Sequence, residues 1–321
     1  MRHDSIARDA IAAFHSASGS RPEVITDRRA LMGGHATISL VGASEELLDA
    51  AFALADRCEA RWSRFLPTSD ITLLNWAEGR TVGVDPLTVR LIIAMRDAAT
   101  LTGGAYDPTL LPRVLEAGYA ASAVAPDLVT TLPATARAPG SLAAIEVEGT
   151  EVKMPLGTTL DPGGIGKGLA ADIVAEFALA EGAWGVMAEF GGDIVVAGRA
   201  PDGVAWLLGV EDPFDTARHL TTVRIARGAI VTSSRRKRRF TTAEGERHHL
   251  IDPATGMNPA GSIQTVTVIA ATGARAEALA KPGFVRPPAD YLAWLPGVGA
   301  AGLLIGADGA VHASTNWGSY A

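Results

Sequence analysis

The chain has 321 residues, of which 48% are hydrophobic and 20% charged, and its formal net charge is −7. This composition is typical of a soluble globular protein with a substantial core, and it excludes an intrinsically disordered chain. The net negative charge also argues against nucleic acid as the main partner, because phosphate backbones are bound by an excess of Lys and Arg.

The cellular location is predicted from the N-terminus, the hydropathy and the cysteine content. Residues 1–24 include acidic side chains and lack the long apolar stretch of a signal peptide. No run approaches the ~18 uninterrupted apolar residues of a membrane-spanning helix. The single cysteine, Cys58, permits no internal disulfide, and its apolar surroundings in the sequence indicate an inert, buried thiol. We therefore predict a cytoplasmic protein without a membrane partner.

The first elements are read from periodicity and end signals. Residues 1–26 show little periodicity and are predicted to form an N-terminal arm. The pattern over 30–41 predicts one strand with a glycine pair at its start. Ser44 then suits the N-cap of a helix whose apolar residues recur on one face.

A second helix is predicted with Asp85 as its cap and Pro86 at its first position, running towards Gly103. The Ala/Pro-rich stretch 120–139 is typical of a surface excursion and could separate two lobes.

The second half of the chain alternates apparent strands with one strong helix, Gly168–Glu181, closed by Gly182. Strands are expected at 185–190, 194–197, 205–210, 229–233, 265–270 and 302–305. Long antiparallel-looking strand runs with helices grouped between them predict an α+β fold.

Two glycine-rich segments adjoin helices. Thr102–Thr109 is interpreted as a helix C-cap followed by an Asp-Pro turn, or as a loop that approaches a ligand through Asp107. Leu160–Gly168 leads into the strongest helix, so its backbone N–H groups and Lys167 could bind a phosphate; a plain turn is the alternative. Its spacing matches neither the P-loop nor the dinucleotide motif.

Two further segments lie between strands. Glu189–Asp193 is interpreted as a hairpin turn with Asp193 bound to local N–H groups. The pair His248-His249 in a strand would point to opposite faces, and this geometry argues against a metal site made from both.

The basic run Arg235-Arg-Lys-Arg-Arg239 stands out in an acidic chain. We interpret it as alternating strand residues with solvated charges. The alternatives are that it holds the phosphates of a nucleotide or steers an acidic target protein to the surface.

Taken in order, these segments resemble the FAD:protein FMN transferase family (ApbE-like), over roughly residues 27–310. The matching segments are Leu31-Met-Gly-Gly34, Trp62-Ser-Arg-Phe-Leu-Pro-Thr-Ser-Asp70 with Asn75, Gly103-Gly-Ala-Tyr-Asp-Pro108, Asp161-Pro-Gly-Gly-Ile-Gly-Lys-Gly168, Gly191-Gly-Asp193, Thr232-Ser233, His249-Leu-Ile-Asp-Pro-Ala-Thr-Gly256 and Ala276-Glu-Ala-Leu279.

The resemblance implies an α+β fold of two interlocked lobes with largely antiparallel sheets, over residues 27–315 with a divide near 120–140, and a flavin-nucleotide cleft between the lobes. It implies an enzyme that cleaves FAD, moves FMN onto a threonine of an acceptor flavoprotein and releases AMP. Some members hydrolyse FAD to FMN and AMP instead, so an FAD pyrophosphatase is one alternative.

The resemblance also implies the site residues. Residues carried over as binding the flavin nucleotide are Met32, Phe65, Ala105, Tyr106, Asp107, Asp161, Lys167, His249 and Ile251. Residues carried over as catalytic are His249, Glu277 and Lys281, and those at a Mg²⁺ site are Gly164 and Glu277.

The metal site departs from the family pattern. An Asp and, four residues later, a Thr are usual, but this chain has Glu277 and Lys281, and Pro282 follows. Mg²⁺ requires oxygen ligands, and an ammonium group repels a cation. Lys281 therefore stands in for the metal, or the chain is a flavin-binding protein, with or without redox activity, that has lost metal-dependent transfer. A helix end with a solvated lysine, and an interaction scaffold without flavin, are the remaining alternatives.

Overall fold

The computed structural model describes residues 22–236, 238–242 and 245–321. Most of the predicted N-terminal arm, and the segment in which a signal peptide was sought, lie outside them. The helices of the described part are α2 (Glu45–Trp62), α3 (Asp70–Asn75), α4 (Pro86–Thr102), α5 (Leu111–Glu116), α6 (Gly166–Ala180), α7 (Gly273–Ala280) and α8 (Pro288–Trp294).

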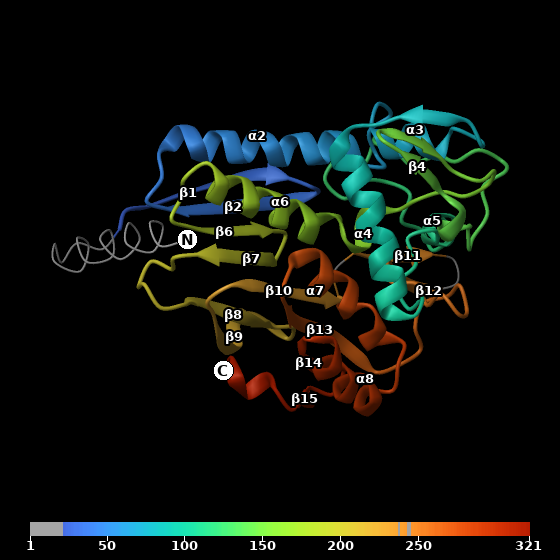
Figure 1. Cartoon of the computed structure of the whole chain (residues 1–321). Coiled ribbons are helices and arrows are strands. Elements are labelled where there is room, and N and C mark those ends of the chain that lie inside the picture. The colour runs from blue at the N-terminus through green and yellow to red at the C-terminus, as the bar shows by residue number, and fades with distance from the viewer. Residues whose placement is uncertain (1–21, 237, 243–244) are drawn as a thin grey trace.

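An eight-stranded antiparallel sheet forms the centre of the molecule (Figure 1), in the order β1-β2-β6-β7-β10-β13-β14-β15. Its strands are β1 (Val24–Leu31), β2 (Gly34–Val41), β6 (Gly185–Phe190), β7 (Asp193–Gly198), β10 (Gly228–Ser234), β13 (Ile263–Ala270), β14 (Ala301–Gly306) and β15 (Val311–Ala313). Helices and an antiparallel sheet together confirm the predicted α+β class.

Smaller strand groups surround this sheet. They are β3 (Thr81–Gly83), β4 (Glu146–Glu148) and β5 (Glu151–Lys153) in one group, β8 (Trp206–Asp212) with β9 (Asp215–Ile225), and β11 (Arg239–Thr242) with β12 (Gly245–His248). Residues 117–141 connect α5 to the β4 region without a helix or named strand. That agrees with the predicted excursion at 120–139; its role as a divide between lobes stays a prediction.

The two faces of the central sheet are covered differently. Successive residues of a strand point to opposite faces. Val231 and its cross-strand partner Val268 belong to the core shared with α2, α6 and α7, whereas Ile230 and its partner Ile269 belong to the core under β8 and β9. Helices therefore cover one face and a long hairpin covers the other (Figure 1).

The predicted helix ends are confirmed. The Ser44 hydroxyl accepts from the Leu47 N–H, the Asp85 carboxylate accepts from the Leu87 N–H, and Gly103 ends α4 in the left-handed conformation. Cys58 is fully buried within α2, as predicted, and burial raises the pKa of its thiol to about 12.

The predicted single strand over 30–41 is wrong. The chain forms a hairpin there: β1 begins at Val24, before the predicted domain start at residue 27, and turns at Met32 and Gly33 into β2. Met32 adopts a positive φ of 50°, which is uncommon for a residue with a side chain, so Gly33, with a φ of 72°, is the only turn signal at these two positions. The turn places Met32 at the edge of the site described below.

Helices α6 and α7 approach each other very closely. A Cβ on Gly168 would lie 2.3 Å from the carbonyl oxygen of Gly273. The two glycines therefore let the two helix starts pack backbone to backbone. Within the described ranges, no helix is long and apolar enough to cross a membrane.

Candidate active site

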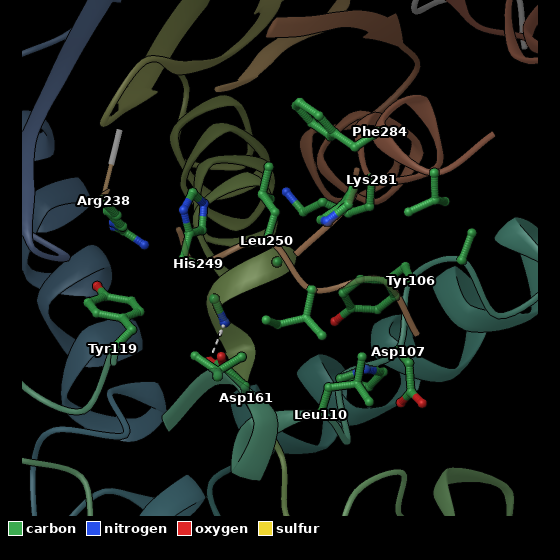
Figure 2. Close-up of a pocket in the computed structure, with 18 residues that line it drawn as sticks. Tyr106, Asp107, Leu110, Tyr119, Asp161, Arg238, His249, Leu250, Lys281 and Phe284 are labelled. Carbon is green, nitrogen blue, oxygen red and sulfur yellow. Dashed lines mark hydrogen bonds between the residues drawn. The ribbon is translucent and has the colours of Figure 1, made fainter. Parts of the chain in front are cut away.

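Two adjoining cavities lie beside the start of α6. The larger has a volume of about 400 Å³ and the smaller about 90 Å³. Tyr119, Asp161, Gly163 and Arg238 line both, so the cavities meet at these residues. Figure 2 shows the smaller cavity, with Arg238 and Tyr119 towards one end and Tyr106 and Lys281 towards the other.

The structure gathers nearly all of the predicted site residues around these cavities. Those that line the smaller cavity are Ala105, Tyr106, Asp107, Asp161, Gly164, His249, Ile251 and Lys281. Those that line the larger cavity are Met32, Phe65, Asp161 and Lys167. Segments from both halves of the chain therefore build a single candidate site.

Glu277 is the one predicted site residue that lines neither cavity. Its side chain is 1% exposed, and its carboxylate accepts a hydrogen bond of 2.8 Å from the Gly168 N–H. The other carboxylate oxygen lies 3.7 Å from the Lys167 ammonium. Glu277 thus anchors the start of α6 and forms an ion pair with Lys167, which lines the larger cavity.

Lys167 extends from the first turn of α6, where the sequence predicted a phosphate-binding lysine. Its ammonium forms an ion pair with Asp193 as well as the longer one with Glu277. The predicted bonds between Asp193 and local N–H groups are therefore wrong. In the β6–β7 hairpin it is Glu189 that accepts from a local N–H, that of Gly192, at 2.8 Å.

The turn before α6 brings the backbone close to Tyr106. Asp161 accepts a 2.9 Å hydrogen bond from the Gly163 N–H, drawn as a dashed line in Figure 2, and so fixes the turn. A Cβ on Gly164 would lie 2.7 Å from the Tyr106 ring. Gly164 therefore permits a close approach that no other residue type would.

The Asp107 carboxylate accepts hydrogen bonds from its own loop through one of its two oxygens. One of its carboxylate oxygens accepts from the Thr109 N–H at 2.8 Å and from the Thr109 hydroxyl at 2.7 Å. This is the Asp-Pro turn that the sequence predicted. The same side chain also lines the smaller cavity, so the turn and a ligand contact are compatible.

Two buried polar atoms in the smaller cavity have no hydrogen-bond partner among the described residues: the Tyr106 hydroxyl oxygen and Nδ1 of His249. Burial raises the pKa of Tyr106 well above its ordinary value. Burial, with the nearby Arg238 and Lys281, lowers the pKa of His249 well below its ordinary value. Both side chains are therefore neutral near pH 7, and each has capacity to hydrogen-bond a ligand.

Lys281 enters the smaller cavity from the end of α7. Its ammonium donates a 3.0 Å hydrogen bond to the Ser233 hydroxyl of β10. Its side chain also lies against the turn before α6, since a Cβ on Gly164 would be 3.4 Å from the Lys281 Cε. Burial lowers the pKa of Lys281, and the nearby Glu277 carboxylate opposes that shift.

These residues do not fit the Mg²⁺ that the family resemblance implies. Both oxygens of Glu277 face donors, and Gly164 offers only its backbone. Lys281 adds an ammonium group against the same turn. Over the described ranges, no three or more His, Cys, Asp and Glu side chains cluster so as to hold a metal ion. Mg²⁺ needs several free oxygen ligands in octahedral geometry, which this set does not supply.

The sequence interpretation missed a stack of cationic and aromatic side chains at the junction of the cavities. The guanidinium carbon of Arg64 lies 4.2 Å from the Phe65 ring centroid and 4.7 Å from that of Tyr119. Arg238 lies over the same Tyr119 ring at 5.5 Å. Such contacts are attractive and orient the guanidinium groups. The one sequence feature that could have indicated this stack is the arginine within the Trp62–Asp70 motif.

Arg64 is also a buried anchor. It donates hydrogen bonds to the Tyr119 carbonyl at 2.8 Å and the Thr130 hydroxyl at 2.7 Å, and its Nε lies 3.6 Å from Asp161. It thus ties the 117–141 connection to the turn before α6.

The basic run does not form alternating strand residues, so that prediction is wrong. Arg235 and Arg236 form a turn after β10, Arg239 is the first residue of β11, and Lys237 lies outside the described part. Arg235 donates to the Gly261 carbonyl, and Arg236 lies over the Phe214 ring at 5.6 Å. Arg238 adopts a positive φ of 54° and lines both cavities.

Comparisons with known proteins agree with this site. The model of the ApbE family matches residues 32–302. The FAD:protein FMN transferase of Treponema pallidum is 29% identical over 289 residues, which cover 83% of this chain and 79% of that protein. The FAD:protein FMN transferase of Vibrio cholerae is 31% identical over 185 residues, 56% of this chain and 55% of that protein. The crystal structure of the ApbE protein from Thermotoga maritima superposes with a TM-score of 0.80 at 27% identity, over 93% of this chain and 99% of that one. The chain belongs to the ApbE family.

Proposed function

We propose that this protein is an FAD:protein FMN transferase, which takes FAD as substrate, attaches FMN to a threonine of an acceptor flavoprotein and releases AMP. Membership of the ApbE family and the names of its relatives support this activity. The observation in the structure that carries it is the pair of cavities that meet at a cationic junction.

FAD consists of two ring systems joined through a negatively charged pyrophosphate. The larger cavity offers Met32 and Phe65 for one ring system, and the smaller offers Tyr106 for the other end. Arg238 lies at the junction, and Lys281 lines the smaller cavity. This order of apolar, cationic and apolar groups suits a dinucleotide whose pyrophosphate spans the junction.

The transfer step needs a base and charge stabilisation. The threonine hydroxyl oxygen attacks the phosphorus of the FMN half, the bond from that phosphorus to the AMP oxygen breaks, and AMP leaves with both electrons of that bond. The hydroxyl proton goes to a base, a role that we assign to the neutral imidazole of His249. Positioning and positive charge supply most of the acceleration in phosphoryl transfer.

The activity is tested with purified protein, FAD and an acceptor flavoprotein, with and without MgCl₂. We expect AMP release and an acceptor that keeps its flavin fluorescence after denaturing electrophoresis. An acceptor with the target threonine changed to valine is the matched control and should stay unlabelled. Equal amounts of AMP and free FMN without acceptor would instead identify an FAD pyrophosphatase. FAD binding without AMP would identify a flavin-binding protein.

The base is tested by the variant His249→Asn. We expect the transfer rate to fall by about 10²- to 10⁴-fold while FAD affinity changes much less, since a base acts on the step and not on binding. The control is His312→Asn, because His312 is exposed on β15. An unchanged rate in His249→Asn would assign the proton to another group.

A further inference from the structure

The acidic side chains in and beside the smaller cavity each have at least one carboxylate oxygen that contacts a donor. Glu277 accepts from the Gly168 N–H and faces the Lys167 ammonium. Asp193 pairs with the same ammonium. Asp161 holds the Gly163 N–H and lies 3.6 Å from Arg64 Nε, and Asp107 holds Thr109. A divalent cation that recruited Glu277 or Asp193 would have to break an existing ion pair and, at Glu277, the hydrogen bond to the start of α6.

The Lys281 ammonium, by contrast, is held in place at the cavity wall. Lys281 is half-buried at the end of α7, its Cε lies beside Gly164, and its Nζ is oriented by the 3.0 Å hydrogen bond to Ser233. An ammonium group has three donors, and this contact uses one of them. Within the described residues the other two have no hydrogen-bond acceptor, so they are available to oxygen atoms that enter the cavity.

We infer that Lys281 replaces a divalent cation in this chain: its ammonium is the built-in positive charge that binds a phosphate group of the flavin nucleotide, and the site works without Mg²⁺. The inference rests on the proposed flavin substrate and adds to it how the phosphate is neutralised. Arg238, which lines the same cavity, supplies a second positive charge, so the two side chains together match the charge of one divalent ion.

The first test uses the native protein. FAD and FMN affinities are measured by calorimetry in EDTA and again in MgCl₂, and binding of Mn²⁺ is followed by the loss of its free electron-paramagnetic-resonance signal, with and without FAD. We expect equal affinities in both buffers and no Mn²⁺ bound at micromolar concentration. Tight, FAD-dependent binding of one Mn²⁺, or an affinity that requires Mg²⁺, would overturn the inference.

The second test removes the charge. In Lys281→Met the affinities for FAD and FMN should fall about ten- to hundredfold, the usual value of a hydrogen bond between charged groups. Affinity for riboflavin, which has no phosphate, should stay unchanged. Lys281→Arg keeps the charge and should retain most of the preference for FMN over riboflavin. The matched control Lys153→Met changes an exposed lysine of β5 and should bind all three as the native protein does.

The outcomes separate this inference from the proposed function. A native protein that binds no flavin contradicts the proposed function itself. A native protein that binds FAD, together with a Lys281→Met variant that loses riboflavin and FMN equally, contradicts only the role of Lys281 towards phosphate. The metal measurements on the native chain decide the same point even if Lys281→Met does not fold.

Discussion

Two buried tyrosines in this protein differ in what their hydroxyl groups meet. The Tyr291 hydroxyl donates a 2.9 Å hydrogen bond to the Leu279 carbonyl. The Tyr106 hydroxyl lies in the smaller cavity and is without a partner in the described part of the chain. A buried hydroxyl that lacks a partner costs about 1–3 kcal/mol relative to one that is satisfied. The first stabilises the fold, and the second is available to a ligand.

Tyr106→Phe should therefore separate stability from binding. We expect the free energy of unfolding of the ligand-free protein to stay the same or rise by up to about 1 kcal/mol, since an unsatisfied hydroxyl is removed. FAD affinity should fall by about threefold to tenfold, because a hydrogen bond to the ligand is lost. Urea unfolding and calorimetry measure the two quantities.

Tyr291→Phe is the matched control. It should lower the free energy of unfolding by about 1 kcal/mol and leave FAD affinity unchanged. If Tyr106→Phe destabilises the ligand-free protein as Tyr291→Phe does, the Tyr106 hydroxyl has a structural partner and is not reserved for flavin.

For single residues, the sequence predicted which side chains gather at the site better than it predicted their hydrogen-bond and ion-pair partners. Lys167 was expected at a helix start near phosphate, and it does line the larger cavity. Its ion pairs with Asp193 and Glu277 join a helix, a hairpin and a second helix. No local pattern reports such long-range contacts. The roles assigned to the site residues stay predictions.

Among the secondary-structure elements, α6 and α7 are linked by hydrogen bonds to one buried carboxylate, that of Asp172. Asp172 of α6 accepts hydrogen bonds from the Gly273 N–H at 2.7 Å and the Ala274 N–H at 2.9 Å, at the start of α7. Burial raises the pKa of Asp172 from 3.8 to about 6, although these two donors oppose the shift. The folded protein therefore holds the Asp172 proton more tightly than the unfolded chain does.

This shift predicts a pH dependence of stability. Because the raised pKa favours the protonated folded state, the free energy of unfolding should fall as pH rises from about 4 to about 6, by about 2–3 kcal/mol from this group alone. In Asp172→Asn that contribution disappears. The stability of the variant relative to native should therefore be higher at pH 7 than at pH 4.5, as measured by urea unfolding.

Asp290→Asn changes an exposed carboxylate on α8 and serves as the control, with no such difference expected. A stability difference between Asp172→Asn and native that is the same at both pH values would show that Asp172 is ionised in the folded protein throughout this range.

Elements with strong end signals were predicted well, and those set by tertiary contacts were not. The start of α4 at Pro86 was read from Asp85 and Pro86, whereas the Met32 turn and the basic turn before β11 were missed. In both missed turns a residue with a side chain, Met32 or Arg238, adopts a positive φ. Propensity places glycine or asparagine there, so packing around the site overrides it.

For the whole molecule, the site is assembled from nearly the full length of the described chain. Met32 lines the larger cavity, and Val285 lines the smaller one. A ligand at the junction of the cavities therefore contacts segments that separate on unfolding. Binding to the folded state alone stabilises it by mass action.

FAD should accordingly stabilise the entire protein. At a concentration one hundred times its Kd, FAD should raise the free energy of unfolding by about 2.7 kcal/mol. For a chain of this size the melting temperature then rises by roughly 4 °C. Differential scanning calorimetry across an FAD titration measures the shift. AMP alone, which occupies only one part of the site, should give a smaller shift at equal concentration, and an equal shift would contradict a site that spans both cavities.

Because Cys58 is buried, a reporter dye can be attached to an introduced cysteine without labelling the native thiol. The sequence has one cysteine, and its enclosed thiol is protonated at any working pH, so maleimide dyes should not label the native chain. A single thiol introduced at Ala123, an exposed residue on the wall of the larger cavity, would then be the one labelled position. A fluorophore there would report flavin entry and departure in real time, without any cysteine having to be removed first.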